Sequence, residues 1–194
     1  MPLPNVNIVL ETGAGIEGAN SYVSVAMAAT YLAANAFAGD WFELDDMDKA
    51  RNLIRASQIV DGLVIWNGYK KSREQGLAWP RSAAADPEAR RDSFRDPLSS
   101  GFEDTAGFLP DDEVPEVIRQ VVCEIANSLL EANPATDSDA RGVRSLNLGK
   151  EALKVELQAG SESQTGLSRY VEGLLLPFGR LKAGQGGGVF NVIR

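Results

Sequence analysis

Apolar residues recur at intervals of three and four positions in four stretches of the chain, and this pattern predicts four helices. The first stretch follows Ser24, whose hydroxyl can cap the free amides at the start of a helix. The stretch after Pro115 has the most continuous apolar face and is the expected centre of the core. The four predicted helices cover about residues 25–36, 45–66, 115–130 and 167–176.

Shorter alternating segments predict a few strands between these helices. Residues 6–10 contain Val and Ile ahead of a glycine-rich break, and residues 153–157 alternate apolar with charged side chains. Residues 70–112 instead mix Gly, Pro, Ser, Asp and Arg, which predicts a long irregular loop that is functional or folded against a partner. The expected fold class is mainly α: a small helical bundle of about four helices, with a few short β-strands, a long irregular loop and an extended C-terminal tail.

The C-terminal end of the chain predicts a separate arm. We expect one helical domain over residues 1–178 and a flexible Gly-rich arm over residues 179–194. Three consecutive glycines at 186–188 precede an apolar tip, which a single subunit could hardly bury on so loose a tether. We therefore expect the tip to dock on a neighbouring chain, by adding a strand. The tip consists of Val189, Phe190, Val192 and Ile193.

The composition is that of a globular protein with an acidic surface. Of 194 residues, 44% are hydrophobic and 24% are charged, and the formal net charge is -8. This charge disfavours a protein that grips nucleic acid over its whole surface, because such binding needs concentrated Lys and Arg. The single cysteine, Cys123, lies on the apolar side of a predicted helix, so we expect a buried thiol and a cytosolic origin. Neither a signal peptide nor a membrane-spanning run is recognisable, and we expect a soluble protein.

The sequence offers few groups for catalysis, and we expect no enzyme, no cofactor and no metal site. The chain has no histidine, which excludes imidazole bases, Ser-His triads and His-ligated zinc. No phosphate loop with Gly followed by Lys-Ser/Thr occurs. The acidic residues at 45–48 suit the first turn of a helix. Asp137 and Asp139 lack further ligands at the spacing of a calcium loop.

Three glycines near the start of the chain, Gly13, Gly15 and Gly18, have the G-x-G-x-x-G spacing of a dinucleotide-binding loop. Such a loop also needs a preceding strand, a helix that starts at the glycines and a second parallel strand that carries an acid. Here the next helix starts several residues later, and another helix follows it. The sequence therefore favours a glycine-rich turn over a cofactor site.

The segment IWNGYKKSREQGLAWPR, residues 65–81, combines aromatic and basic residues, as single-strand nucleic-acid-binding surfaces do. Two interpretations remain open. Its aromatics and cations could together line a groove for single-stranded DNA. Alternatively, its tryptophans anchor the loop to the helices while its cations face water, and the mixture of acids and bases around it favours this second interpretation. The residues in question are Trp66, Tyr69, Lys70, Lys71, Arg73, Trp79 and Arg81.

The order of five segments resembles that of a known family. These segments read GIEGANSYVSVAMAATYLAA, KARNLIRASQIVDG, GLAWPRSAA, VPEVIRQVVCEIANSLL and LKVELQ. In this order they resemble the tailed-phage family often labelled DnaT-like single-stranded-DNA-binding proteins. The resemblance extends over most of residues 11–177, and its most specific pieces are 19–25, 56–61 and 77–82.

The resemblance implies a structural virion protein without catalytic activity. Members of this family resemble head–tail connector, or adaptor, proteins in the phage neck, which bridge the portal and the tail and form part of the DNA conduit. A homo-oligomeric ring is implied, a dodecamer if it matches the portal, with the portal protein and a further neck or tail-terminator protein as partners. Genomic DNA would pass through the acidic lumen without specific binding, and no membrane is involved.

This resemblance also implies a location and a set of contacts. The protein would lie in the virion neck, and in the host cytoplasm during assembly. Its candidate interface residues toward the portal or a neighbouring subunit are Trp79, Arg81, Phe102, Phe108, Val189, Phe190, Val192 and Ile193.

The family label itself suggests an alternative, a single-stranded-DNA-binding replication protein. Salt-dependent binding of single-stranded DNA would distinguish this alternative from a connector. An enzyme that uses carboxylates is the weakest of the three hypotheses.

Overall fold

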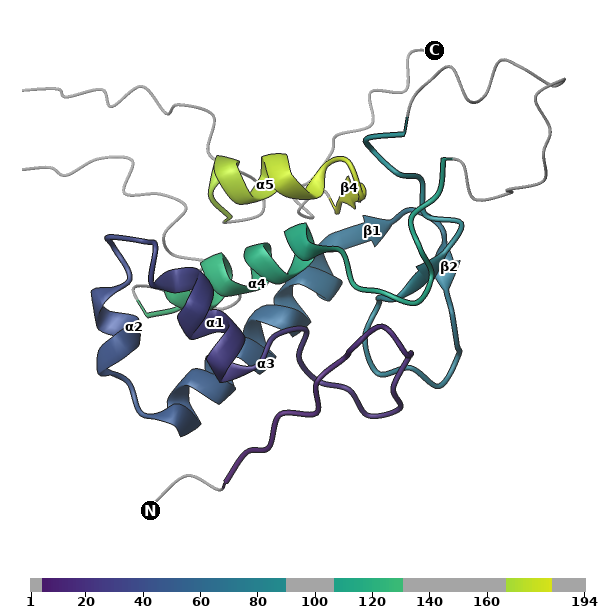
Figure 1. Ribbon diagram of the computed structural model, residues 1–194. Helices are drawn as coiled ribbons and strands as arrows, with labels where there is room; N and C mark the ends of the chain where they lie inside the picture. Colours follow the sequence, from purple (N-terminus) through teal and green to yellow (C-terminus); the bar gives the residue numbers. More distant parts are fainter. Residues whose placement is uncertain (1–4, 90–106, 131–166, 183–194) are drawn as a thin grey trace, which may run out of the picture.

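The computed structural model describes residues 5–89, 107–130 and 167–182 of the chain. Within these residues it contains five helices, α1 to α5, and four short strands, β1 to β4 (Figure 1). The helices, in order, are Val25–Leu32, Gly39–Glu43, Asp46–Leu63, Glu116–Ser128 and Arg169–Leu175. The strands are Val64–Trp66, Tyr69–Lys70, Arg81–Ser82 and Gly179–Leu181.

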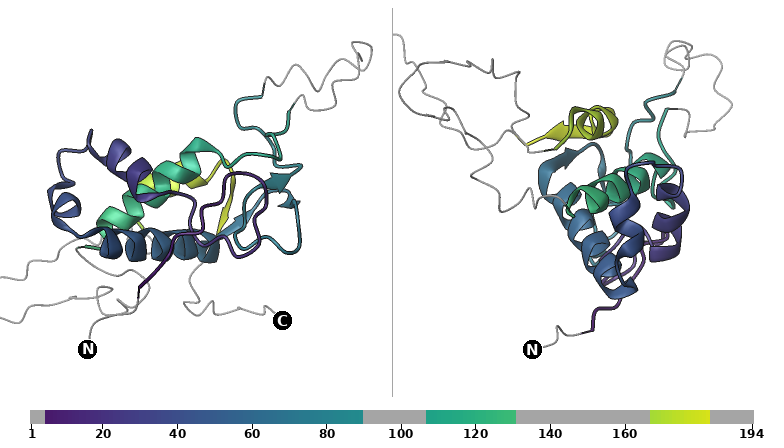
Figure 2. Two further views of the ribbon diagram at one scale, coloured as in Figure 1. Left: turned by 60° about the horizontal axis from the view of Figure 1, so that its bottom comes forward. Right: turned by 90° about the vertical axis from the view of Figure 1, so that its left-hand side faces the viewer.

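Helices α3 and α4 pack against each other at the centre of the fold, and α1 and α5 each pack against α4 (Figures 1 and 2). Both central helices bury residues at helical spacing, such as Leu53 and Val60 on α3 and Ile118 and Val122 on α4. Cys123 is also buried, which confirms the expected packing of its thiol, and burial raises the pKa of this thiol to about 12. The helix predicted after Pro115 therefore does lie in the core.

Side chains cap the start of three helices, as the sequence suggests for the first of them. The hydroxyl of Ser24 accepts from the backbone N–H of Met27 at 3.2 Å at the start of α1. At the start of α3, a carboxylate oxygen of Asp45 accepts from the N–H of Asp48 at 2.7 Å. Ser168 caps α5 in the same way. These caps explain why the three helices begin close to their predicted positions.

Two small antiparallel sheets stand beside the helices. Strand β1 continues directly from α3 and pairs with β4, so that Ile65 lies opposite Arg180, while β2 pairs with β3. The expected fold class, a bundle of about four helices, is therefore wrong: the described residues hold five helices and two two-stranded sheets. Strands of two or three residues are too short for an alternating pattern to reveal, and their partners are distant in sequence.

Other expectations differ from the structure in detail. The five-residue helix α2 is absent from the prediction because it is too short for periodicity, yet it buries Trp41 completely. The predicted strand at residues 6–10 makes only one bridge, between Leu10 and Ser21. The fold continues past residue 178, because β4 belongs to a sheet. The strand predicted at 153–157 lies outside the described residues.

Candidate nucleic-acid interface

The segment 65–82 contributes its two tryptophans to the core. Trp79 is fully buried, and its ring meets that of Trp66 edge to face, with 5.8 Å between the ring centroids. Phe178, which lies just before β4, also packs edge to face on Trp79, with 6.2 Å between the ring centroids. The aromatic side chains thus tie the loop to α5 and β4, and the expected anchoring role of the tryptophans is confirmed.

Arg81 is turned inward and holds the backbone of the same segment. Its guanidinium and Nε donate to three carbonyl oxygens, those of Asn67 at 2.7 Å, Gly68 at 2.6 Å and Ala78 at 3.0 Å. Only 9% of this residue is exposed, and burial lowers the pKa of its guanidinium. Arg81 therefore uses its fork of donors to fix the turn that leads into β2.

A buried carboxylate fixes the opposite end of the segment. The two oxygens of Asp61, on α3, accept from the hydroxyl of Tyr22 at 2.7 Å and from the N–H of Ala78 at 2.8 Å. The Tyr22 hydroxyl in turn accepts from the N–H of Trp79 at 3.1 Å. Burial raises the pKa of Asp61, although these hydrogen bonds and the charges of Lys70 and Arg81 oppose that effect.

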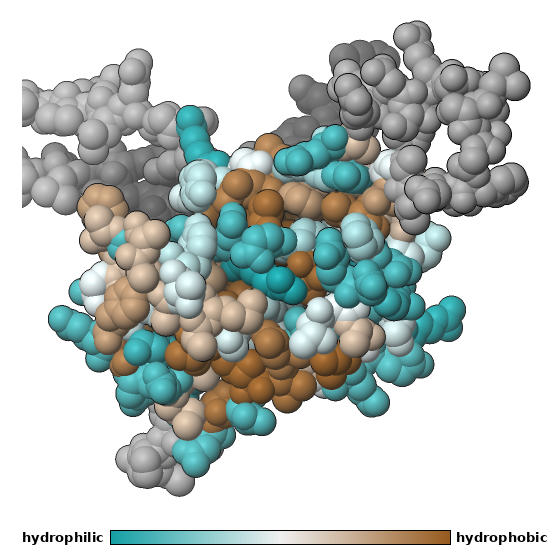
Figure 3. Space-filling model, viewed as in Figure 1, coloured by the Kyte–Doolittle hydropathy of each residue, from teal (hydrophilic) through white to brown (hydrophobic). Residues whose placement is uncertain are grey.

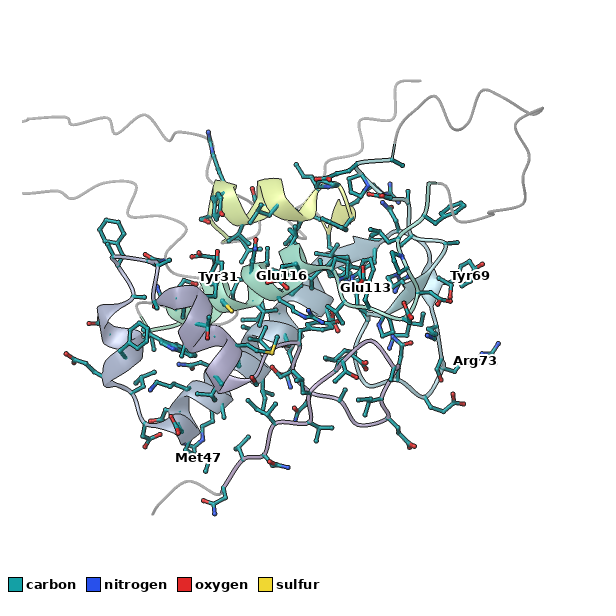
Figure 4. The ribbon with its side chains drawn as sticks, in the orientation of Figure 1. Tyr31, Met47, Tyr69, Arg73, Glu113 and Glu116 are labelled. Atoms are coloured by element: carbon teal, nitrogen blue, oxygen red, sulfur yellow. The ribbon has the colours of Figure 1, made fainter. Side chains whose placement is uncertain are left out.

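Between these anchors, four of the five positions 69–73 carry exposed side chains suited to binding nucleic acid. Tyr69 is 64% exposed, and Lys70, Lys71 and Arg73 are also exposed. Figure 4 shows Tyr69 and Arg73 extending from the same end of the molecule, the end formed by β2. We call this group, Tyr69 with Lys70, Lys71 and Arg73, the Tyr69–Arg73 surface. It combines a ring on which a base can stack with cations for the phosphates.

The cations of this surface differ in whether they already have partners within the chain. Lys71 lies 3.6 Å from a carboxylate oxygen of Asp111, and Lys70 donates to the carbonyl of Gln75 at 3.3 Å. The carboxylate of Glu74 accepts from the hydroxyl of Ser72, which lowers the pKa of Glu74. No described residue pairs with Arg73. Arg73 is thus the cation most available to a ligand.

The glycine-rich loop at 11–18 presents amides to an anion, but the chain supplies that anion itself. The carboxylate of Glu11, only 1% exposed, accepts from the backbone N–H groups of Gly13 at 2.9 Å, Gly15 at 3.0 Å and Ile16 at 2.7 Å. Gly13 adopts φ 112°, and a Cβ there would meet the carbonyl of Asp112. The loop is therefore a turn closed by its own carboxylate, as the sequence favours, and its amides are unavailable to a phosphate.

The structure separates the candidate interface residues predicted from the sequence. Trp79 and Arg81 are buried and serve the fold of the loop, whereas Phe108 is 42% exposed and its contact with a partner stays a prediction. The remaining candidates lie outside the described residues: Phe102, Val189, Phe190, Val192 and Ile193. Sequence reasoning grouped Tyr69 and its basic neighbours with the tryptophans, because only the fold shows which of them are exposed.

No group of three or more potential ligand side chains that could hold a metal ion occurs among residues 5–89, 107–130 and 167–182. In the same part of the chain, no helix has the length and apolar character needed to cross a membrane.

Comparison with known proteins gives one match. Residues 6–93 match the family model described as "Putative DnaT-like ssDNA binding protein", which agrees with the family label suggested by the sequence segments. No curated protein and no solved structure matches the chain. The matched range includes the whole Tyr69–Arg73 surface.

This match corrects the functional expectation. The prediction of a phage head–tail connector, with its virion location and portal-binding dodecameric ring, is wrong, because the matching family is described by single-stranded DNA binding. The alternative drawn from the sequence, a protein that binds single-stranded DNA, is the better supported of the two.

Proposed function

We propose that this chain binds single-stranded DNA through the Tyr69–Arg73 surface and acts by binding, without catalysis. The observation that carries the proposal is the coincidence of two facts. The family that matches residues 6–93 is described by single-stranded DNA binding, and the exposed aromatic and basic residues of this range lie together at β2.

The chemistry of the surface suits an unpaired strand. The exposed ring of Tyr69 offers a face on which one base can stack, and base–aromatic stacking contributes about 1–3 kcal/mol per base. Lys70, Lys71 and Arg73 can contact the phosphates on either side of that base. A duplex keeps its bases stacked on one another inside the helix, so that no base would be free to stack on the ring of Tyr69. The surface should therefore prefer single strands.

The acidic character of the whole chain limits the affinity without excluding binding. The formal net charge is -8, but at physiological ionic strength charges more than about 8 Å apart are largely screened. A bound strand therefore senses mainly the three cations of the surface and the acids near them, which include Glu74 and Asp111. We expect weak binding, with a dissociation constant of roughly 10⁻⁴ to 10⁻⁵ M at physiological salt.

Fluorescence anisotropy with a labelled oligothymidylate tests this proposal on the full chain. Three phosphate contacts predict a slope of about -2 for the logarithm of affinity against the logarithm of salt concentration, or about a twentyfold loss between 50 and 200 mM. Arg73→Gln should weaken binding severalfold and reduce the slope by about 0.7. Arg55→Gln, which removes the same charge from α3, is the matched control and should change neither.

Two results would overturn the proposal. One is the absence of any binding at 50 mM salt with protein in the millimolar range. The other is an equal loss of affinity for Arg73→Gln and Arg55→Gln, which would show that only the overall charge of the chain matters.

A further inference from the structure

A groove on another part of the molecule has the features of a peptide-docking site. It measures about 510 Å³ and lies between the N-terminal segment, the start of α1 and the start of α3. In Figure 3 apolar surface gathers in the lower centre of the view, where the N-terminal segment crosses the helices in Figure 1. The groove is lined mainly by apolar side chains, among them Val6, Ile8, Leu10, Val25, Met47 and Ala50.

The N-terminal segment offers this groove an unpaired strand edge. The odd-numbered residues face residues 20–21: the Val9 N–H donates to the side-chain oxygen of Asn20 at 2.8 Å, and the Glu11 N–H donates to the Ser21 carbonyl at 2.9 Å. The N–H of Val6 points the other way, to the sulfur of Met47 in the groove. Since partners alternate along a strand, the amides of Ile8 and Leu10 also face the groove, and no described residue accepts from them.

We propose that the last residues of this same chain, Val189–Arg194, add a strand to Ile8 and Leu10 and so fill the groove of their own subunit, in place of the docking on a neighbouring chain that the sequence suggests. Their sequence, VFNVIR, supplies apolar side chains for an apolar groove, and main-chain hydrogen bonds would complete the edge. Phe190 and Val192 are two positions apart, so that a strand places them on one face, toward the groove, and Asn191 on the other.

Charge supports the same occupant. Asp46 lines the rim of the groove with its side chain 88% exposed, and its nearest described cation, Lys49, is 3.8 Å away. Arg194 follows the apolar tip directly and would bring a cation to this carboxylate. A second copy of the groove edge would instead bring another Asp46, which disfavours pairing of two such edges.

The chain is long enough for this contact within one subunit. Lys182 is fixed at the end of α3, where its N–H donates to the Leu63 carbonyl at 2.7 Å. Ala50, in the groove, lies 13 residues earlier on the same helix, or about 20 Å at 1.5 Å per residue. The seven residues 183–189 reach roughly 23 Å when extended, which is enough to span this distance.

Amide hydrogen exchange on the full chain tests the inference at single residues. In the natural sequence the N–H groups of Ile8 and Leu10 should exchange at least tenfold more slowly than in Phe190→Asp. The matched variant Asn191→Asp adds the same charge on the opposite face of the strand and should keep the protection. The N–H of Val9, already bonded to Asn20, should exchange alike in all three proteins.

Each other outcome contradicts the inference. Equal exchange of Ile8 and Leu10 in all three proteins would mean that the C-terminal segment does not cover this edge. Loss of protection in Asn191→Asp as large as in Phe190→Asp would mean that apolar packing does not hold the C-terminal segment in the groove. Protection that increases with protein concentration would assign the groove to a second copy. None of these measurements involves DNA, so they leave the proposed function unaffected.

Discussion

The segment 65–82 has a buried half, formed by its two ends, and an exposed half, formed by its middle, and these contain similar residues in opposite surroundings. Trp66, Trp79 and Arg81 are buried and bind the loop to the helices and to β4, while Tyr69 and its basic neighbours point into solvent. The difference lies in which groups already have partners within the chain. Arg81 donates to three carbonyls, whereas Arg73 has no partner among the described residues. We therefore expect the exposed half to bind a ligand and the buried half to stabilise the fold.

The largest expected difference between the halves is in stability. Trp79→Ala should lower the free energy of unfolding by about 4 kcal/mol, because it empties a fully buried aromatic site. Tyr69→Ala should change it by no more than about 0.5 kcal/mol, since the ring is largely exposed. Urea unfolding followed by circular dichroism measures both.

A second variant controls for the ring itself. Trp79→Phe keeps an aromatic ring and removes an indole N–H that has no described acceptor, so that it should cost clearly less than Trp79→Ala. Equal costs for Tyr69→Ala and Trp79→Ala would contradict the division into a buried and an exposed half.

The next effect concerns the two arginines. Arg81→Lys should lower the free energy of unfolding by about 2 kcal/mol, because an ammonium cannot reach three carbonyls in a fixed fork. Arg73→Lys should leave stability unchanged. Thermal unfolding of the two variants compares the roles directly, and an unchanged midpoint for Arg81→Lys would show that the inward fork does not stabilise the turn.

A smaller effect depends on pH and on Asp61. Because burial raises the pKa of Asp61 above its value in the unfolded chain, the folded state binds this proton more tightly. The contribution of Asp61 to stability is therefore largest below pH 3.8 and decreases as the pH rises through the raised pKa, by at most about 1.4 kcal/mol per pH unit.

Comparison with Asp61→Asn isolates this contribution from that of other carboxylates. The difference in unfolding free energy, natural sequence minus variant, should fall between pH 4 and pH 7. A difference that stays constant over this range would show that the buried carboxylate does not titrate in it. Tyr22, Lys70 and Arg81 face Asp61 and are unchanged in the variant.

The smallest expected effect is an increase in the affinity of the exposed half for single-stranded DNA. Asp111→Asn should tighten binding of single-stranded DNA about threefold at 50 mM salt, because it releases Lys71 from an exposed ion pair of less than about 1 kcal/mol. Asp40→Asn, which removes an exposed acid from α2, is the control for net charge. Equal gains in both variants would mean that Lys71 contributes no local contact.

The sequence predicts much of the helical framework, because the apolar spacing of α3 and α4 and the caps at Ser24 and Asp45 are local signals. It does not predict the two sheets, since the pairing of Val64 with Leu181 joins residues far apart in the chain. The sequence also cannot separate Tyr69 from Trp66 by residue type alone. Burial decides between them, and Trp66 is buried against Trp79, which packs in turn on Phe178.

The glycine-rich loop at 11–18 likewise shows that residue types alone do not identify a binding site. Its spacing matches that of a phosphate-binding loop, but Glu11 already accepts three of its amides. A motif that binds a ligand must leave its donors free, and only the structure shows that these are engaged. On the Tyr69–Arg73 surface, Lys70 and Lys71 are engaged within the chain, whereas the Tyr69 side chain is exposed and Arg73 has no partner among the described residues.

The most direct test of the account compares two exposed tyrosines, Tyr69 on β2 and Tyr170 on α5, which are 64% and 60% exposed. Anisotropy titrations of labelled oligothymidylate measure the affinity of the natural sequence and of the two alanine variants at 50 mM salt. Stacking of one base on Tyr69 predicts a loss of about 1–3 kcal/mol for Tyr69→Ala, at least fivefold in affinity, and no change for Tyr170→Ala. Equal affinities for all three proteins, or a larger loss for Tyr170→Ala, would contradict it.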